Sequence, residues 1–255
     1  MMLAAEYGRR IASGEIAPGT VLPTEKEIQL HHGVSRTVVR EAMRHLSAKG
    51  LVTVGPKVGT RVSEPIQWNM LDADVMGWHL FAGISRPFVE ALYEMRLINE
   101  PAAAHAAAER ISQEQIVRLE AALDGMAENP RGSSEQIAAD LAFHRIILEA
   151  TANPILVSLG TMIERSLSIS FSLSWRQITQ RDSVQQHRRV LEAIRDRDGE
   201  AAALYMRRLI ESAFDDVTRQ LYPEGEGGGK ADAGAAGAMC SRHDGGHQGA
   251  AEGLR

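Results

Sequence analysis

Residues 34–50 read VSRTVVREAMRHLSAKG, and this stretch decides the fold of the N-terminal part of the chain. Ser35 is of a type that caps helices and Gly50 of a type that ends them, so a helix is expected over 36–48. Its apolar residues recur at helical spacing and form one stripe, made of Val38, Val39, Ala42, Met43 and Leu46. The remaining surface of the helix holds Arg36, Thr37, Arg40 and Arg44.

Two shorter helices are expected before this one. The first covers 6–13 and places Tyr7 and Ile11 on one face. The second begins after Thr24, a capping residue, and ends at Gly33. Like the helix expected over 36–48, this one has a capping residue before it and a glycine after it.

A β-hairpin is expected directly after the third helix. Two short β-branched runs, 51–54 and 60–62, flank a turn rich in glycine and proline. Three helices followed by a hairpin make a winged helix-turn-helix, which we assign to residues 1–64. The fold class expected for the whole chain is mainly α.

The exposed side of helix 36–48 is the candidate surface for DNA. In this fold the second helix of the motif enters the major groove, where arginine suits phosphates and the guanine edge and threonine suits the thymine methyl. The wing and the free backbone N–H groups near Ser35 can approach phosphates. The candidate DNA-binding residues are Lys26, Ser35, Arg36, Thr37, Arg40, Arg44, Lys57 and Gly59. The alternative is a solvated face in which the arginines pair with Glu41 and similar neighbours.

The same residues resemble the GntR-type winged helix, and the resemblance covers 8–63. The motifs that carry it are Pro18-Gly19, Leu22-Pro23-Thr24-Glu25, Val34-Ser35-Arg36-Thr37-Val38-Val39-Arg40-Glu41-Ala42, Lys49-Gly50-Leu51-Val52 and Gly59-Thr60-Arg61-Val62. The resemblance implies a homodimer that reads a short palindrome in double-stranded DNA, with Arg36 and Arg40 contacting bases.

The charge of the chain is divided unevenly. The net charge is −5 overall, but residues 1–64 carry +3, residues 65–222 carry −6 and the rest carries −2. A basic part joined to an acidic one is expected when only one of them meets phosphate. No stretch approaches the ~20 consecutive apolar residues of a membrane span, and no signal sequence is evident, so a cytoplasmic protein is expected. The single cysteine, Cys240, excludes an internal disulfide.

From residue 65 the pattern is helical throughout, which predicts a linker helix within 65–82 and an antiparallel bundle over 83–222. The expected helices cover 72–82, 87–109, 113–127, 135–150, 155–176, 183–197 and 200–221. Residues 223–255 are rich in glycine and alanine and are expected to be disordered. Cys240, His243 and His247 in this tail could bind a metal, but its composition favours a solvated segment without such a role.

The helical part resembles the FCD effector domain of the FadR branch of the GntR family. The motifs that carry the resemblance are Glu94-Met95-Arg96, Glu100-Pro101, Asp140-(x)2-Phe143-His144, Ala152-Asn153-Pro154 and His187-(x)3-Leu191. The linker, with Trp68-Asn69-Met70-Leu71-Asp72 and Trp78, is closest to regulators of sugar-acid operons such as the galactonate operon. The resemblance implies a repressor, not an enzyme, that leaves its operator when a small carboxylate such as an aldonate binds.

A metal site is one interpretation of Asp140, His144 and His187. Asp140 and His144 are four residues apart on one expected helix, so their side chains point the same way, and His187 could join them from another helix. Such a set could hold Zn²⁺, Ni²⁺ or Mn²⁺, and the alternative is an ordinary ion pair with His187 elsewhere. The resemblance implies these three ligands and a fourth histidine, but Leu209 occupies that fourth position. The metal is therefore either held by three protein ligands or absent.

Arg96 is the main candidate for effector binding. Its guanidinium lies in an apolar helical segment and needs a partner, which is either Glu100 one turn later or a ligand carboxylate bound by two hydrogen bonds. Asn99 and Trp175 are further candidates for contacts with effector hydroxyls.

Two other functions compete with a sugar-acid sensor. A fatty-acyl or other hydroxy-acid sensor is one, although the polar Asp140, His144, His187 and Arg96 do not suit an acyl pocket. A metal-dependent enzyme is the other, but the sequence offers no evident nucleophile or paired carboxylate near these residues.

Overall fold

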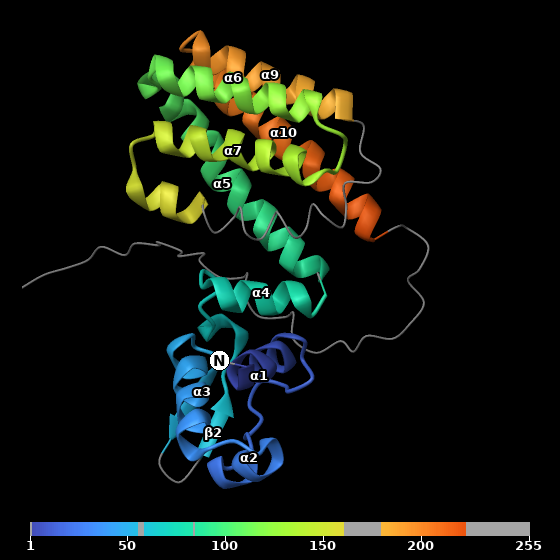
Figure 1. Cartoon of the computed structure of the whole chain (residues 1–255). Helices are drawn as coiled ribbons and strands as arrows, with labels where there is room; N and C mark the ends of the chain where they lie inside the picture. Colours follow the sequence, from blue (N-terminus) through green and yellow to red (C-terminus); the bar gives the residue numbers. More distant parts are fainter. Residues whose placement is uncertain (1, 56–58, 84, 161–179, 223–255) are drawn as a thin grey trace, which may run out of the picture. The chain divides into compact units, whose positions relative to one another are not determined.

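A computed structural model describes residues 2–55, 59–83, 85–160 and 180–222 of the 255-residue chain (Figure 1). Over these ranges the chain is mainly helical and has one two-stranded sheet, so the expected fold class is confirmed. Lys57, Trp175 and the expected tail 223–255 lie outside the described residues. No helix in the described ranges is both long and apolar enough to cross a bilayer.

The N-terminal part has the expected order of three helices and a hairpin. Its helices are α1 (Met2–Ala12), α2 (Glu25–His32) and α3 (Arg36–Ala48), and its strands are β1 (Val52–Gly55) and β2 (Gly59–Val62). The strands pair antiparallel, with Val52 opposite Val62. Helix α1 begins four residues earlier than predicted, because Leu3 and Ala4 add two buried residues to its inner face.

The predicted caps explain where these helices begin and end. Thr24 and Glu27 form a capping box at α2: the Glu27 N–H donates to Thr24 Oγ1 at 3.3 Å, and the Thr24 N–H donates to Glu27 Oε2 at 2.7 Å. Gly33 ends α2 in the left-handed conformation. The Ser35 side chain caps α3 by accepting from the Val38 N–H at 3.4 Å. Ser35 therefore has a structural role at the start of the motif helix.

The predicted apolar stripe of α3 needs one correction. Val39, Ala42, Met43 and Leu46 are buried in the core of the N-terminal part, but Val38 is 42% exposed. Val38 lies at the edge of the stripe, where it lines a groove together with Leu3 and Ala4 of α1. Only four of the five expected positions therefore belong to the core.

The linker helix packs into the same core as the winged helix. After a short 3₁₀ turn (Pro65–Gln67), α4 covers Ala73–Phe81. Val75 and Trp78 of α4 are buried in the N-terminal cluster, and the Trp78 ring lies directly against the Cα of Gly8 on α1. Residues 65–81 therefore pack as part of the N-terminal unit.

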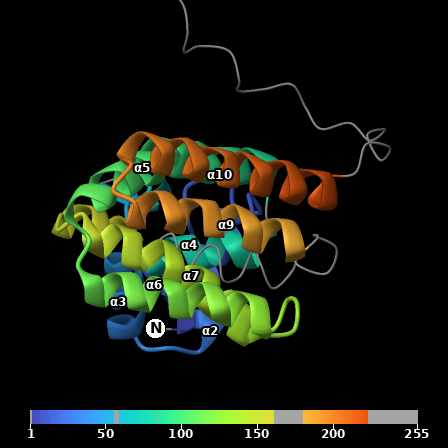
Figure 2. The same cartoon turned by 90° about the horizontal axis from the view of Figure 1, so that it is seen from above.

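The rest of the described chain forms the expected helical bundle (Figure 2). Its helices are α5 (Arg86–Arg110), α6 (Gln113–Glu128), α7 (Ser134–Ala150), α9 (Gln180–Arg195) and α10 (Gly199–Leu221). Residues 154–160 are also helical, and the remainder of the expected helix 155–176 lies outside the described residues. Helix α9 ends two residues before the predicted end, and Arg197 then adopts a left-handed φ of 62°.

Packing in the bundle joins helices that are distant in sequence. Helix α5 packs along α10 and contacts α7 and α9, while α6 pairs with α7 and α9 with α10. A large apolar cluster with Tyr93, Phe143 and Met206 fills most of the interior, and a small second one contains Leu92 and Ile137. The contacts of α5 with α7 and α9 bring polar side chains from all three helices into this interior.

Candidate functional site

The exposed face of α3 carries the predicted DNA-binding side chains. Arg36 and Arg44 have 71% and 82% of their side-chain surface exposed, and Thr37 and Arg40 are exposed as well. A hollow lies between α3 and the hairpin, lined on one side by Thr37, Arg40 and Arg44 and on the other by Val54 and Thr60. The face is open and rich in donors.

Only some of these arginines form the ion pairs that the alternative of a solvated face predicts. Arg36 Nε lies 3.1 Å from Glu25 Oε2 of α2, and Arg44 lies 3.9 Å from Glu41. The Arg40 side chain has no ion pair or hydrogen bond to any described residue. Because both pairs are exposed to water, they contribute little and leave the arginines available to a polyanion.

The other predicted contacts lie around this face or outside the described residues. Lys26 on α2 and Gly59 at the start of β2 are exposed, and Gly59 has a left-handed φ of 80° that favours glycine. Ser35 is exposed at the N-terminus of α3, where the first backbone N–H groups point outward. Lys57 in the turn of the wing lies outside the described residues.

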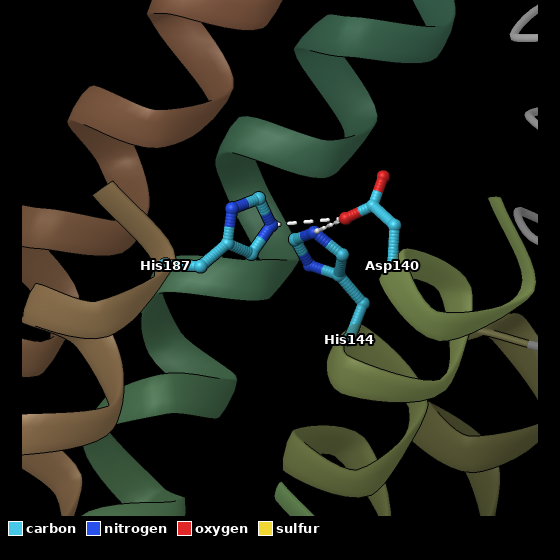
Figure 3. A group of neighbouring side chains, drawn as sticks. All are labelled: Asp140, His144 and His187. Carbon is cyan, nitrogen blue, oxygen red and sulfur yellow. Dashed lines mark ion pairs between the residues drawn. The ribbon is translucent and has the colours of Figure 1, made fainter. Parts of the chain in front are cut away.

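In the bundle, the structure brings Asp140, His144 and His187 together (Figure 3). Asp140 and His144 project from α7 and His187 projects from α9, as predicted. Asp140 Oδ1 lies 2.9 Å from His187 Nε2 and 3.5 Å from His144 Nε2. All three ligand atoms lie within 4.8 Å of one another, and the side chains are almost fully buried. The alternative with His187 elsewhere is wrong.

The atoms of this group have the properties of metal donors. Asp140 Oδ1, His144 Nδ1 and His187 Nε2 are buried, and none of them makes a hydrogen bond of regular geometry to a described residue. His187 Nδ1 lies 2.8 Å from the Ser183 carbonyl oxygen, to which it can donate, so Nε2 is left as the acceptor that faces Asp140. One carboxylate and two imidazoles suit Zn²⁺, Ni²⁺ or Mn²⁺, so the residues present fit a divalent ion.

The charges around the group favour its ionised state. Burial alone would raise the pKa of Asp140, but the adjacent imidazoles of His144 and His187 hold it well below its usual range. Burial would lower the pKa of His144, but the charge of Glu100 and the contacts of the ring with the Asp140 and Glu100 carboxylates raise it to about 9. Without a metal, His144 is therefore a buried imidazolium between two carboxylates.

Leu209 cannot complete the group. It lies on α10, it is 4% exposed, and it belongs to the apolar cluster of the bundle. Asp140, His144 and His187 are the only described residues that form a cluster with metal-ligand spacing. A metal held here would therefore have three protein ligands from this set.

Arg96 pairs with Glu100, one of its two predicted partners, and one of its nitrogens makes no hydrogen bond to a described residue. Its Nε and Nη2 donate to Glu100 at 2.6 and 3.3 Å, and both side chains are buried. Its third nitrogen, Nη1, is buried and has no hydrogen bond to any described residue. The Tyr93 hydroxyl, one turn earlier on α5, is also buried without such a bond. These two groups are neighbours, since Arg96 Cζ lies 5.3 Å from the centre of the Tyr93 ring.

The remaining predicted effector contacts are less informative. The Asn99 side chain donates to the Met95 carbonyl oxygen at 2.7 Å, which occupies its amide within α5. Trp175 lies outside the described residues. Sequence reasoning missed Tyr93 as a polar neighbour, and it treated Glu100 only as a partner of Arg96. Both lie on α5 at helical spacing from Arg96, which was the available signal.

Comparison with known proteins gives the same division of the chain. The family described as "Bacterial regulatory proteins, gntR family" matches residues 2–62, and the family described as "FCD domain" matches residues 91–212. The galactonate operon transcriptional repressor of Escherichia coli (strain K12) is 32% identical over 216 residues, covering 84% of this chain and 93% of that protein. The HTH-type transcriptional regulator YieP of the same strain is 35% identical over 215 residues, covering 83% and 92%.

Solved structures show the same fold. The structure of Lar, described as controlling the expression of the Listeria monocytogenes agr system, has a TM-score of 0.55 at 20% sequence identity. The match covers 87% of this chain and 95% of that one.

Proposed function

The chain belongs to the gntR family of bacterial regulatory proteins, with an FCD domain after its DNA-binding domain, and we propose that it is a repressor released from DNA by a small carboxylate. As a member of this family it is a DNA-binding transcription regulator and not an enzyme.

The DNA-reading surface in this proposal is the exposed face of α3. Arg36, Arg40 and Arg44 are open to solvent, and Thr37 lies between them at the start of the helix. We assign contacts with DNA bases to these four side chains. We assign contacts with the phosphate backbone of the DNA to Lys26, Ser35, Lys57 and Gly59. A homodimer would place two such helices on a palindromic operator, since half-site symmetry mirrors the symmetry of the protein.

The effector in this proposal is a sugar acid or a related hydroxy acid. The observation that carries it is the buried Arg96 Nη1, a donor without a hydrogen bond of regular geometry to any described residue, close to the Tyr93 ring. A guanidinium in such a place is suited to a carboxylate. The polar set around it disfavours an acyl chain, and the name of the galactonate operon repressor supports the sugar-acid class.

A divalent metal ion is the second part of the effector site. Asp140, His144 and His187 would hold it, and with Leu209 in the apolar cluster the ion would keep positions open for water or an effector carboxylate. When bound, the ion supplies positive charge to which a carboxylate can bind. Arg96 then orients the ligand through its free Nη1, while the surrounding apolar residues exclude water.

A thermal-shift screen tests the effector proposal. Purified protein is heated with galactonate, other sugar acids, hydroxy acids and acyl thioesters, each with and without a chelator. A sugar acid at about 100 times its Kd should stabilise the protein by about 2.7 kcal/mol, and chelation should reduce this effect. Stabilisation by acyl thioesters alone would contradict the proposal. A stabilising acid must also weaken operator binding, because only a ligand that prefers one state shifts the equilibrium.

A further inference from the structure

Glu100 contacts both functional groups of the bundle. It lies on α5, one turn after Arg96, and its carboxylate is almost fully buried, with 4% of the side chain exposed. Oε1 accepts from Arg96 Nε at 2.6 Å, and Oε2 accepts from Arg96 Nη2 at 3.3 Å. The same Oε2 forms an ion pair with Nδ1 of His144 on α7 at 2.7 Å, without the angles of a regular hydrogen bond. Glu100 therefore joins the Arg96 side chain on α5 to an imidazole on α7.

The contact with Glu100 lies on the opposite edge of the His144 ring from Asp140. Nδ1 faces Glu100, whereas Nε2 faces Asp140 Oδ1 at 3.5 Å. Only one of these two nitrogens can therefore face the Asp140 group in this orientation. His187 is arranged in a similar way, since its Nδ1 lies against the Ser183 carbonyl and its Nε2 faces Asp140. Each imidazole thus has an acceptor behind it and its Nε2 in front.

We propose that Glu100 is a positioning residue that holds His144 with its proton on Nδ1 and its Nε2 directed to a metal ion. This inference rests on the metal site of the proposed function. Histidine ligands commonly donate their second N–H to a carboxylate, which fixes the tautomer and raises the basicity of the ligand nitrogen. Glu100 does not coordinate the ion, because it lies behind the ring. Arg96 holds both oxygens of this carboxylate and so keeps it in place.

The first test measures metal affinity by competition with a chelating dye at constant pH, using Zn²⁺ alone. Glu100→Gln removes the charge behind His144 with little change in shape, and it should weaken Zn²⁺ binding about 10–100-fold. The matched control is Glu90→Gln on the same helix. Glu90 also pairs with an arginine four residues away, Arg86, at 2.9 Å, but both side chains are exposed. The affinity of the Glu90→Gln variant for Zn²⁺ should stay within about twofold of that of the wild type.

A second readout separates positioning from a general loss of packing. Imidazole nitrogen shifts measured by NMR in the metal-free protein above about pH 9, where His144 is neutral, should place its proton on Nδ1 in the wild type. In Glu100→Gln the proton should move to Nε2, which faces Asp140, while the His187 tautomer is unchanged. A proton on Nε2 of His144 in the metal-free wild type would overturn the inference.

Glu100→Gln leaves the buried Arg96 without its charged partner, and this can prevent folding. In that case Arg96→Met is compared with the double variant Arg96→Met/Glu100→Gln, in which no arginine charge is left unpaired. The same 10–100-fold difference is expected between these two. Equal affinity in a folded pair would overturn the role of Glu100 and leave the metal site standing. Absence of Zn²⁺ binding by the wild type would overturn the metal site, and this inference with it.

Discussion

His144 is the residue whose charge state depends most on its surroundings. It lies between Asp140 and Glu100 in the interior of the bundle, and despite burial these carboxylates raise its pKa from 6.5 to about 9. A group whose pKa is raised by folding stabilises the folded state while it is protonated. This stabilisation is present in full below about pH 6.5 and is lost as the pH rises through about 9.

The first prediction therefore concerns the metal-free protein. In the presence of a chelator, the free energy of unfolding of the wild type relative to His144→Gln should fall between pH 6.5 and pH 9. Urea unfolding of both proteins at a series of pH values measures this difference. The comparison cancels other titrating groups, and a difference that stays constant over this range would refute the assignment.

Part of the group formed by Asp140, His144 and His187 was predictable from helix geometry. Asp140 and His144 are four residues apart on a helix, so helical periodicity alone places them on one face. The prediction that His187 joins them depended on the family resemblance, since the spacing of residues does not tell which helices contact one another. The contact of Glu100 with His144 was not predicted, because it arises where α5 packs against α7.

At the scale of elements, α4 is attached to the DNA-binding part by a cluster of ion pairs. Lys49, directly after α3, is buried, and its Nζ lies 2.6 Å from Asp72 and 2.9 Å from Asp74 at the start of α4. His45 of α3 also lies 3.1 Å from Asp74. These contacts connect the end of the DNA-reading helix to the beginning of the linker helix.

The second prediction is that Lys49→Met destabilises the protein by about 1–2 kcal/mol, since hydrogen bonds to charged groups are lost and the partly exposed carboxylates are left together. Lys49→Arg, which keeps the charge, should retain most of the stability. Urea unfolding measures both. A Lys49→Met protein that is as stable as the wild type would show that the cluster contributes nothing.

The contact between α1 and α4 gives the third prediction. A Cβ added to Gly8 would lie 2.4 Å from the Trp78 ring, which is itself buried, whereas a Cβ on Gly77 of α4 would meet nothing within 4 Å. Gly8→Ala should therefore destabilise the protein by about 1–3 kcal/mol. Gly77→Ala should be neutral or should stabilise it by up to about 1 kcal/mol. Thermal unfolding compares them, and equal effects would argue against this packing.

Elements of this protein were predictable where local chemistry decides them. Caps and glycines located α2, α3 and the hairpin closely. The packing of α4 on α1 was not predictable, because Val75, Met76, Trp78 and Leu80 give α4 apolar residues on more than one side. The pattern therefore does not indicate which side meets a partner. Val38 shows the same limit, since periodicity assigned it to a stripe at whose edge it lies exposed.

For the whole molecule, the division of charge predicts how DNA binding responds to salt. Residues 1–64 carry a net charge of +3 within a chain of net charge −5, and the exposed arginines of α3 lie in this basic part. Binding that neutralises about six phosphates should lose about 10³-fold in affinity between 50 and 200 mM salt. A titration against a DNA duplex at several salt concentrations gives the slope. A flat response would contradict binding through this basic part.

The most direct test compares operator affinities of the wild type, Arg40→Ala and Arg86→Ala, using a duplex selected by the wild type from random sequences. Arg40 is exposed on α3 without an ion pair among the described residues, whereas Arg86 lies on α5 and pairs with Glu90. Arg40→Ala should lose about 1–3 kcal/mol of binding free energy and relax sequence preference, while Arg86→Ala should bind like the wild type. Unchanged affinity and preference in folded Arg40→Ala would contradict the assignment of DNA reading to this face of α3.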